Sequence, residues 1–144
     1  KIKTIKILSI FGIFIISFLA HFIYDVFPNT VTSIFFPVNE SIWEHMKILT
    51  TSIILYGIID YILLRKNNIK VNNFKFQLFF TSFISVIIYL IIYLPTYNII
   101  GENLFISIAL MLIVYVIISY ISYKILLTND LGKINSISPF LIII

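Results

Sequence analysis

Long apolar runs constrain the fold of this chain more than any other feature of its sequence. Four of them cover residues 5–27, 40–64, 76–94 and 104–126, and each has about the 20 mostly apolar residues that a helix needs to cross a membrane. A helix satisfies its backbone hydrogen bonds within its own segment, as lipid requires, whereas barrel strands would be shorter and alternate in polarity. The sequence therefore predicts an all-α fold, a polytopic transmembrane helical bundle. A fifth run at residues 138–144 is expected to begin another span that continues further.

Composition agrees with a membrane protein and excludes several other classes. Of the 144 residues, 60% are hydrophobic, 11% are charged and none is cysteine, whereas a soluble domain averages about 45–50% apolar and about 25% charged residues. So few charges cannot cover a water-facing surface, which excludes a soluble enzyme, a disordered tail and a disulfide scaffold. Since no linker or repeat divides the chain, we interpret residues 1–144 as a single transmembrane domain.

The basic residues predict the orientation of the helices. They flank the first run, occupy the segment between the second and third runs, and follow the fourth: Lys1, Lys3, Lys6, Arg65, Lys66, Lys70, Lys75, Lys124 and Lys133. The other connections, residues 28–39 and 95–103, contain no Lys or Arg. Because these residues accumulate on the cytoplasmic side, we expect a multi-pass protein of the cell membrane with a cytoplasmic N-terminus. The net charge of +4 then reflects topology and not nucleic-acid binding.

Ionisable residues inside apolar runs are costly and mark candidate functional sites. His21 and Asp25 lie four residues apart near the end of the first run, so they share one helix face. The start of the second run carries four more: Glu40, Glu44, His45 and Lys47. A short connection favours antiparallel neighbours. Both groups lie about 6–9 Å inside the helix ends at 1.5 Å per residue, which predicts one polar cluster in the outer leaflet.

A purely structural interpretation of the same residues is also open. Asn39 could cap the second helix, acids are favoured in a first helical turn, and Glu44 could pair with Lys47. His21 and Asp25 could form a hydrogen-bonded pair at a helix interface. Two histidines, three acids and a lysine at one depth exceed what capping requires, and this convergence favours a functional cluster.

The residue types of the cluster suit a metal site that performs hydrolysis. Catalytic zinc often takes two histidines, one glutamate and a water, and the chain has only two histidines. The candidate ligands of zinc or another divalent metal are His21, Asp25, Glu44 and His45. The candidate catalytic residues are Glu40, Glu44, His45 and Lys47. Such a site would hydrolyse a lipid or a peptide at the outer leaflet.

Two other functions fit the same residues. Buried His, Asp and Glu are typical of proton relays and ion-coupled carriers, and a carrier with so few spans would have to be a homo-oligomer. A non-catalytic subunit of a membrane complex could instead use the cluster to bind its partner. The lipid bilayer is an expected partner in every case, and nucleic acid is not.

Further residues are expected to serve helix packing. Asp60 should pair with Arg65 or Lys66, which lie within reach near the same helix end. Gly12 and Gly57 should permit close approach of neighbouring helices. Tyrosine recurs every four residues along the third run, where it should pack or line the cluster: Tyr89, Tyr93 and Tyr97.

Residues 39–47 read N-E-S-x-W-E-H-x-K and follow a first span that contains His21 near its end. This pattern resembles an uncharacterised family of small bacterial multi-pass membrane proteins. The resemblance covers mainly residues 21–47 and implies a further span and a short polar tail beyond residue 144, but no activity. The His-x3-Asp spacing is also similar to one motif of the intramembrane CAAX-type proteases. Their Glu-Glu-x3-Arg motif is absent, so their function is not inferred.

Overall fold

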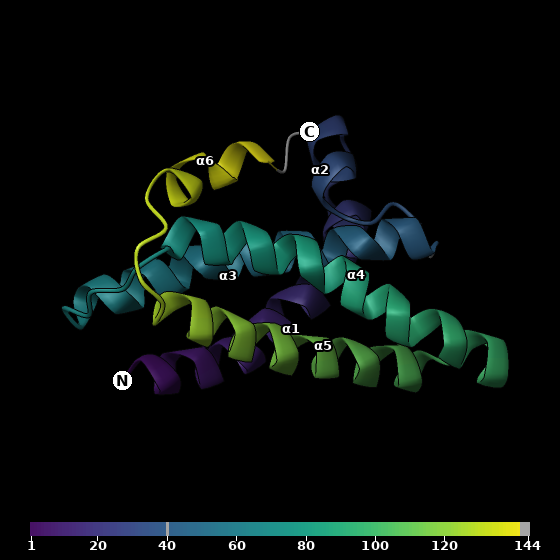
Figure 1. Cartoon of the computed structure of the whole chain (residues 1–144). Coiled ribbons are helices and arrows are strands. Elements are labelled where there is room, and N and C mark those ends of the chain that lie inside the picture. Colours follow the sequence, from purple (N-terminus) through teal and green to yellow (C-terminus); the bar gives the residue numbers. More distant parts are fainter. Residues whose placement is uncertain (40, 142–144) are drawn as a thin grey trace.

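Four long helices make up most of the chain in a computed structural model, which describes residues 1–39 and 41–141 (Figure 1). The long helices are α1 (Ile2–Val26), α3 (Ile42–Lys66), α4 (Phe74–Ile100) and α5 (Leu104–Leu126). The short helices are α2 (Thr30–Phe35) and α6 (Lys133–Leu141). Each long helix is long and apolar enough to cross a membrane, which confirms the prediction of a transmembrane bundle with four spans. Of the fifth run predicted at residues 138–144, the last three residues lie outside the described part of the chain.

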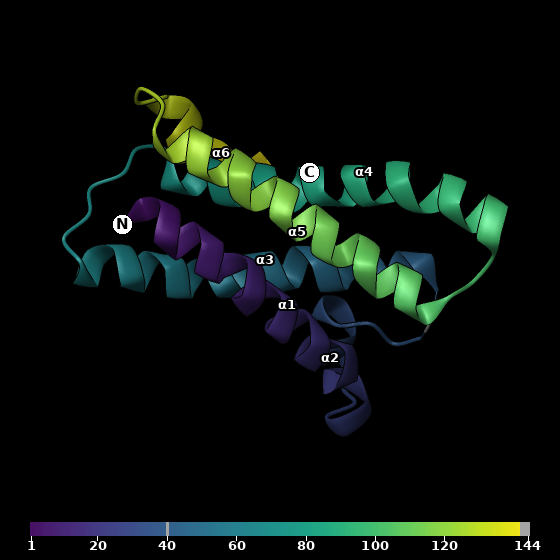
Figure 2. The same ribbon diagram turned by 90° about the horizontal axis from the view of Figure 1, so that it is seen from below.

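The four long helices form a ring when the bundle is seen in cross-section. α1 packs against α3 and α5, and α4 packs against the same two helices from the opposite side. α6 packs on α4, while α2 contacts α1 and α3. Figure 2 shows α1 crossing the others obliquely, so that its C-terminal end diverges from the ends of α4 and α5. We call this end of the bundle, where α1 ends and α3 begins, the histidine end, and the opposite end the basic end.

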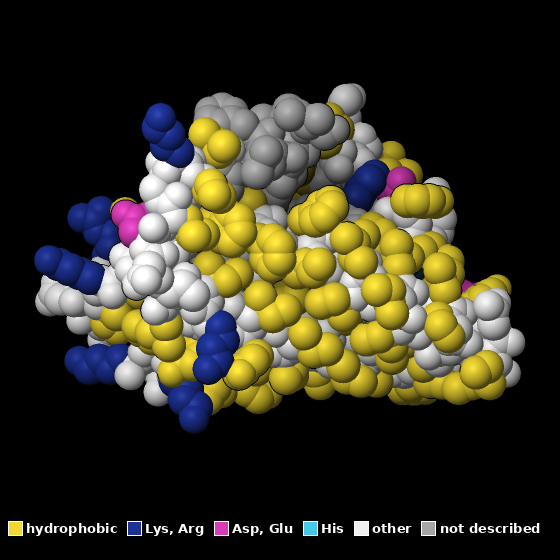
Figure 3. Space-filling model, in the orientation of Figure 1, with side chains coloured by type: hydrophobic (Ala, Val, Ile, Leu, Met, Phe, Trp, Pro, Cys, Tyr) yellow, Lys and Arg dark blue, Asp and Glu magenta, His cyan; other side chains and the backbone are white. Residues whose placement is uncertain are grey.

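Large apolar side chains cover the outer surface of the helices. Exposed examples occur on every long helix: Phe11, Ile15, Ile58, Phe83, Ile91 and Val116. Figure 3 shows this apolar surface between the two ends, with most of the visible Lys and Arg side chains at the basic end. A soluble monomer rarely exposes so large an apolar surface, whereas lipid tails are its natural solvent.

The interior of the bundle is rich in small polar side chains. Buried examples are Ser9, Ser17, Ser52, Thr81, Ser82, Ser85, Ser119 and Ser122. Several return a hydrogen bond to their own helix, as Ser85 Oγ does to the Ser82 carbonyl oxygen at 2.7 Å. Ser122 Oγ on α5 instead donates to Gln77 Oε1 on α4. Because lipid tails are as apolar as leucine, close packing and such hydrogen bonds hold membrane helices together.

Two glycines lie at close helix contacts. A Cβ atom added to Gly12 on α1 would overlap the ring of Tyr56 on α3. A Cβ atom added to Gly57 on α3 would overlap the side chain of Leu78 on α4. The expectation that both glycines permit close helix approach is confirmed, since no larger side chain fits without displacing its neighbour.

A buried ion pair joins α1 to α3 near the basic end. Lys6 Nζ lies 2.6 Å from Asp60 Oδ2, and Ser9 Oγ donates to Asp60 Oδ1 at 2.7 Å. The residues of the pair are only 6% and 3% exposed. The expected pairing of Asp60 with Arg65 or Lys66 is wrong. Asp60 faces the bundle interior, whereas both of those side chains lie on the exposed surface.

α4 is longer than the third apolar run predicts. It continues through Pro95 to Ile100, although residues 95–103 were expected to form a connection. Proline removes one backbone hydrogen bond, a loss that membrane helices tolerate when nearby groups compensate. The carbonyl that Pro95 leaves without its helical donor is that of Ile91, and in the next position Thr96 Oγ1 donates to the Ile92 carbonyl oxygen at 2.8 Å. The longer helix places its last turns beside the histidine end.

Replacing Asp60 should destabilise the bundle, because Asp60→Leu leaves the Lys6 ammonium buried without its carboxylate. Removing one partner of a buried ion pair costs about 3–5 kcal/mol. The double variant Lys6→Met/Asp60→Leu removes both charges and should recover most of this loss. Thermal unfolding of the full chain in detergent micelles measures the effect. A double variant no more stable than Asp60→Leu would contradict this assignment.

Candidate functional site

A cavity of about 420 Å³ lies at the histidine end, between the four long helices. It forms where α1 diverges from α4 and α5 (Figure 2). α1 contributes one continuous stripe to its wall: Phe14, Ser17, Phe18, His21 and Phe22. These positions recur at three- and four-residue intervals, which places them on one helix face. The oblique path of α1 therefore turns a helix interface into a chamber.

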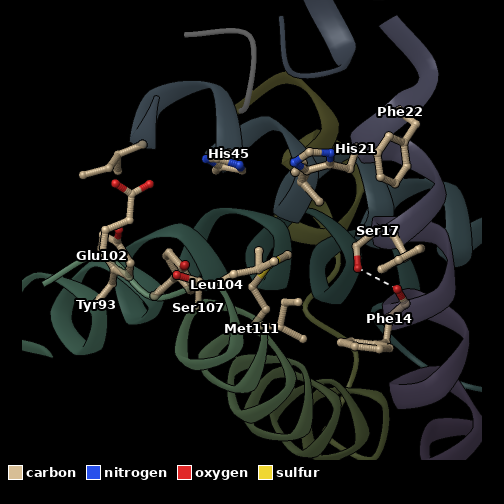
Figure 4. A pocket seen from close by; sticks show the side chains of 15 residues that line it. Phe14, Ser17, His21, Phe22, His45, Tyr93, Glu102, Leu104, Ser107 and Met111 are labelled. Carbon is tan, nitrogen blue, oxygen red and sulfur yellow. Dashed lines mark hydrogen bonds between the residues drawn. The ribbon is translucent and has the colours of Figure 1, made fainter. Parts of the chain in front are cut away.

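His21 and His45 meet at one edge of this cavity. Their ring centroids are 5.6 Å apart, and the two planes are inclined by 30°. Figure 4 shows the two imidazoles side by side, His21 from α1 and His45 from α3. The ring of His21 also contacts that of Phe22 edge-on, with 4.9 Å between centroids. The predicted approach of the two polar groups is confirmed for the histidines.

Glu44 and Lys47 do not line the cavity but hold the connection between α1 and α3. Glu44 Oε2 accepts hydrogen bonds from Lys47 Nζ at 2.6 Å and from the Val38 backbone N–H at 2.9 Å. Lys47 Nζ also donates to the Ser33 carbonyl oxygen at 2.8 Å. The ion pair of the structural interpretation is therefore present, and it fastens α2 and the following segment to α3.

The other predicted residues take different positions. Asp25 is exposed on α1 and does not line the cavity, and Glu40 lies outside the described residues. Asn39 does not cap α3 as expected. Its side-chain oxygen accepts from the Ser41 backbone N–H at 2.9 Å, and Ser41 is the N-cap, whose Oγ accepts from the Glu44 N–H at 3.3 Å.

The metal ligands predicted from the sequence are not assembled as a set. Within residues 1–39 and 41–141, no group of three or more His, Cys, Asp or Glu side chains is placed to hold a metal ion. His21 and His45 come together, but Asp25 is exposed and Glu44 is held by Lys47. Adjacent residues on a helix point about 100° apart, so His45 faces the cavity while Glu44 turns toward α2.

The acid that does line the cavity is Glu102, which the sequence places at the start of the fourth run but which was not among the candidate site residues. It lies just before α5 and reaches the cavity edge near His45 (Figure 4). In the part of the chain that the structure describes, its carboxylate has no salt bridge. The sequence did contain a signal: Glu102 lies in a connection that is predicted to be on the same side of the membrane as the two histidines. The expected lining role of the tyrosines holds for Tyr89 and Tyr93.

The chemistry available in the cavity rests on its imidazoles and its carboxylate. The hydroxyls of Ser17 and Ser107 also line it, but they donate to backbone carbonyl oxygens of their own helices, at 2.7 Å and 3.0 Å. The remaining walls are aliphatic or aromatic. The arrangement suits an apolar guest with one polar end, since most ligand pockets pair apolar walls with a few convergent polar groups.

Fold and site together define a small transmembrane helical bundle with a histidine-edged cavity. The chain belongs to the family described as "Family of unknown function (DUF6512)", which matches residues 1–144. The resemblance to an uncharacterised family is thereby supported at the level of the family. No curated protein and no solved structure matches the chain.

Proposed function

We propose that this protein is an integral membrane protein that binds a lipid-like amphiphile in its cavity. The observation that carries this proposal is the cavity of about 420 Å³ with two histidines at one edge. Its volume lies within the range of about 300–1,000 Å³ typical of small-molecule sites. The apolar walls would receive part of the hydrocarbon chain, and His21 and His45 would hold the polar end.

The position of the cavity favours a guest that comes from the bilayer. It lies between helices whose outer surfaces are apolar, so its walls belong to the span itself. Phe14 and Phe18 form apolar wall on α1, while Ile108 and Met111 do so on α5. Lipid that reaches this site buries its chain without leaving an apolar environment, and only its polar end requires specific partners.

The orientation proposed from the sequence places this cavity in the outer leaflet. Basic side chains gather at the basic end (Figure 3), and Lys and Arg favour the cytoplasmic side of short connections. α1 begins at the basic end and α2 lies at the histidine end. The proposed ligand is therefore a lipid, or a lipid-like substrate, that the protein takes from the outer leaflet.

Filling the cavity should abolish binding. Met111→Trp places an indole in the chamber, and we expect the bound fraction of diheptanoyl phosphatidylcholine to fall at least about tenfold, equivalent to about 1.4 kcal/mol. Native mass spectrometry of the full chain released from detergent measures the bound lipid. Ile113→Trp is the matched control, because Ile113 is exposed on the outside of the same helix. Equal loss in both variants, or none in Met111→Trp, would reject the cavity as the binding site.

Metal-dependent hydrolysis of a lipid or peptide is a second candidate, favoured by the spacing of the imidazoles. A zinc ion about 2.1 Å from one nitrogen of each ring would set the ring centroids about 5–6 Å apart. The observed separation of His21 and His45 is 5.6 Å. Of the predicted catalytic residues that the structure describes, His45 lines the cavity, and Glu44 and Lys47 do not. Catalysis would also need a third ligand beside the two histidines.

Metal analysis distinguishes this second candidate. If the site holds zinc, the full chain equilibrated with Zn²⁺ and then freed of excess metal should retain about one equivalent, because two imidazoles and a further ligand complete a site. His21→Ala and His45→Ala should each lose it, and Asp25→Ala should keep it, since Asp25 lies outside the cavity. Elemental mass spectrometry gives the ratio. Retention below one equivalent, or equal retention in all variants, rejects hydrolysis at a zinc centre.

Single cysteines can test the orientation, since residues 1–144 contain none. Thr30→Cys at the start of α2 should react with a membrane-impermeant maleimide added to intact cells. Lys70→Cys, between α3 and α4, should react only after the membrane is permeabilised. Both positions are exposed, so accessibility in permeabilised cells provides the control. The reverse pattern would show that the N-terminus lies outside.

A further inference from the structure

The charge of the cavity narrows the kind of amphiphile that it can bind. Among the described residues that line it, Glu102 is the one with a formal charge at neutral pH when histidine is counted as neutral. The two acids of α3 are neutralised locally, Asp60 by Lys6 and Glu44 by Lys47, whereas Glu102 stands exposed at the cavity edge. Glu102 has no such salt bridge within the described residues. A carboxylate left uncompensated at the edge of an apolar chamber attracts a cation and repels an anion.

Aromatic rings stand on two sides of the same chamber. Phe18 and Phe22 line it from α1, with ring centroids 5.8 Å apart. Tyr89 and Tyr93 line it from α4, stacked with centroids 5.3 Å apart. α1 and α4 are opposite members of the helix ring, so the two aromatic pairs form separate walls. The negative face of an aromatic ring attracts cations, and quaternary ammonium groups are bound in this way.

From these two observations we propose that the cavity binds an amphiphile with a quaternary ammonium headgroup. The inference rests on the proposed lipid-binding function and names the class of its ligand. Such a headgroup carries its charge within an apolar shell of methyl groups. It therefore contacts aromatic walls and a carboxylate without demanding the hydrogen bonds that a primary ammonium would need in this chamber.

The order of the polar groups also suits a zwitterionic headgroup. Figure 4 shows Glu102, His45 and His21 in this order along one side of the cavity. An imidazole N–H can donate to a phosphate oxygen, whereas a carboxylate cannot. A phosphate beside His21 and His45, with its trimethylammonium group toward Glu102, would match each charge with a suitable partner. Phosphatidylcholine joins these groups in one molecule.

Headgroup selectivity tests the proposal directly. The full chain in detergent is offered diheptanoyl phosphatidylcholine, diheptanoyl phosphatidylglycerol and diheptanoyl glycerol in equal amounts, and native mass spectrometry compares the bound fractions. The two phospholipids share chains and phosphate, and they differ in the group on the phosphate, a choline that makes the headgroup zwitterionic or a glycerol that leaves it anionic. We expect a preference of about tenfold for phosphatidylcholine over phosphatidylglycerol, because the rings and the carboxylate attract the ammonium group and the carboxylate repels a headgroup with net negative charge. Glu102→Gln should remove most of this preference.

The matched control is Asp130→Asn, which removes the same charge from an exposed acid in the connection after α5, and it should leave the preference unchanged. Equal binding of all three lipids would overturn the headgroup proposal and leave lipid binding itself intact. A preference for phosphatidylglycerol, or a choline preference that survives in Glu102→Gln, would also overturn it. Binding of none of the three would reject the proposed function together with this inference.

Discussion

The position of α1 against α3 is the constraint on which the rest of the structure depends. The buried pair of Lys6 and Asp60 holds the first turns of α1, and the contact of Gly12 with Tyr56 holds its middle. Beyond this point α1 leaves the bundle axis obliquely (Figure 2). Attachment of the first half of α1 and divergence of its second half produce a chamber at the histidine end. A parallel, tightly packed α1 would fill that space with its own phenylalanines.

Polar residues that are neighbours in sequence serve different purposes at the histidine end. Glu44 and Lys47 form an ion pair that binds the connection through Val38 and Ser33. His45 lines the cavity instead. Because the ion pair holds the connection against α3, the start of α3 stays in place. The Glu44–Lys47 pair thereby supports the position of His45. Such division of roles explains why the segment is so polar at the start of an apolar helix.

Much of the fold could be predicted, and only part of the site. Four helical spans follow from apolar length alone, and Gly12 was identified as a close contact because small residues serve that purpose in lipid. The partner of Asp60 could not be deduced, since Arg65 is near in sequence whereas Lys6 is near only after α1 packs on α3. Glu102 was not assigned to the site because a residue in a connection has no helical face from which its direction can be read.

The sequence by itself determined the solvent, the number of spanning helices and the ends at which charges gather. Backbone hydrogen bonding in lipid admits only helices for such runs, so no tertiary information was needed. Tertiary structure alone decided which polar side chains share a cavity. Periodicity shows which residues share a face of one helix. Packing sets the rotation and tilt of that helix against its neighbours. Since successive residues are about 100° apart around the helix, a small rotation changes which side chain faces the cavity. The angle between successive residues separates His45, at the cavity, from Glu44, in its ion pair.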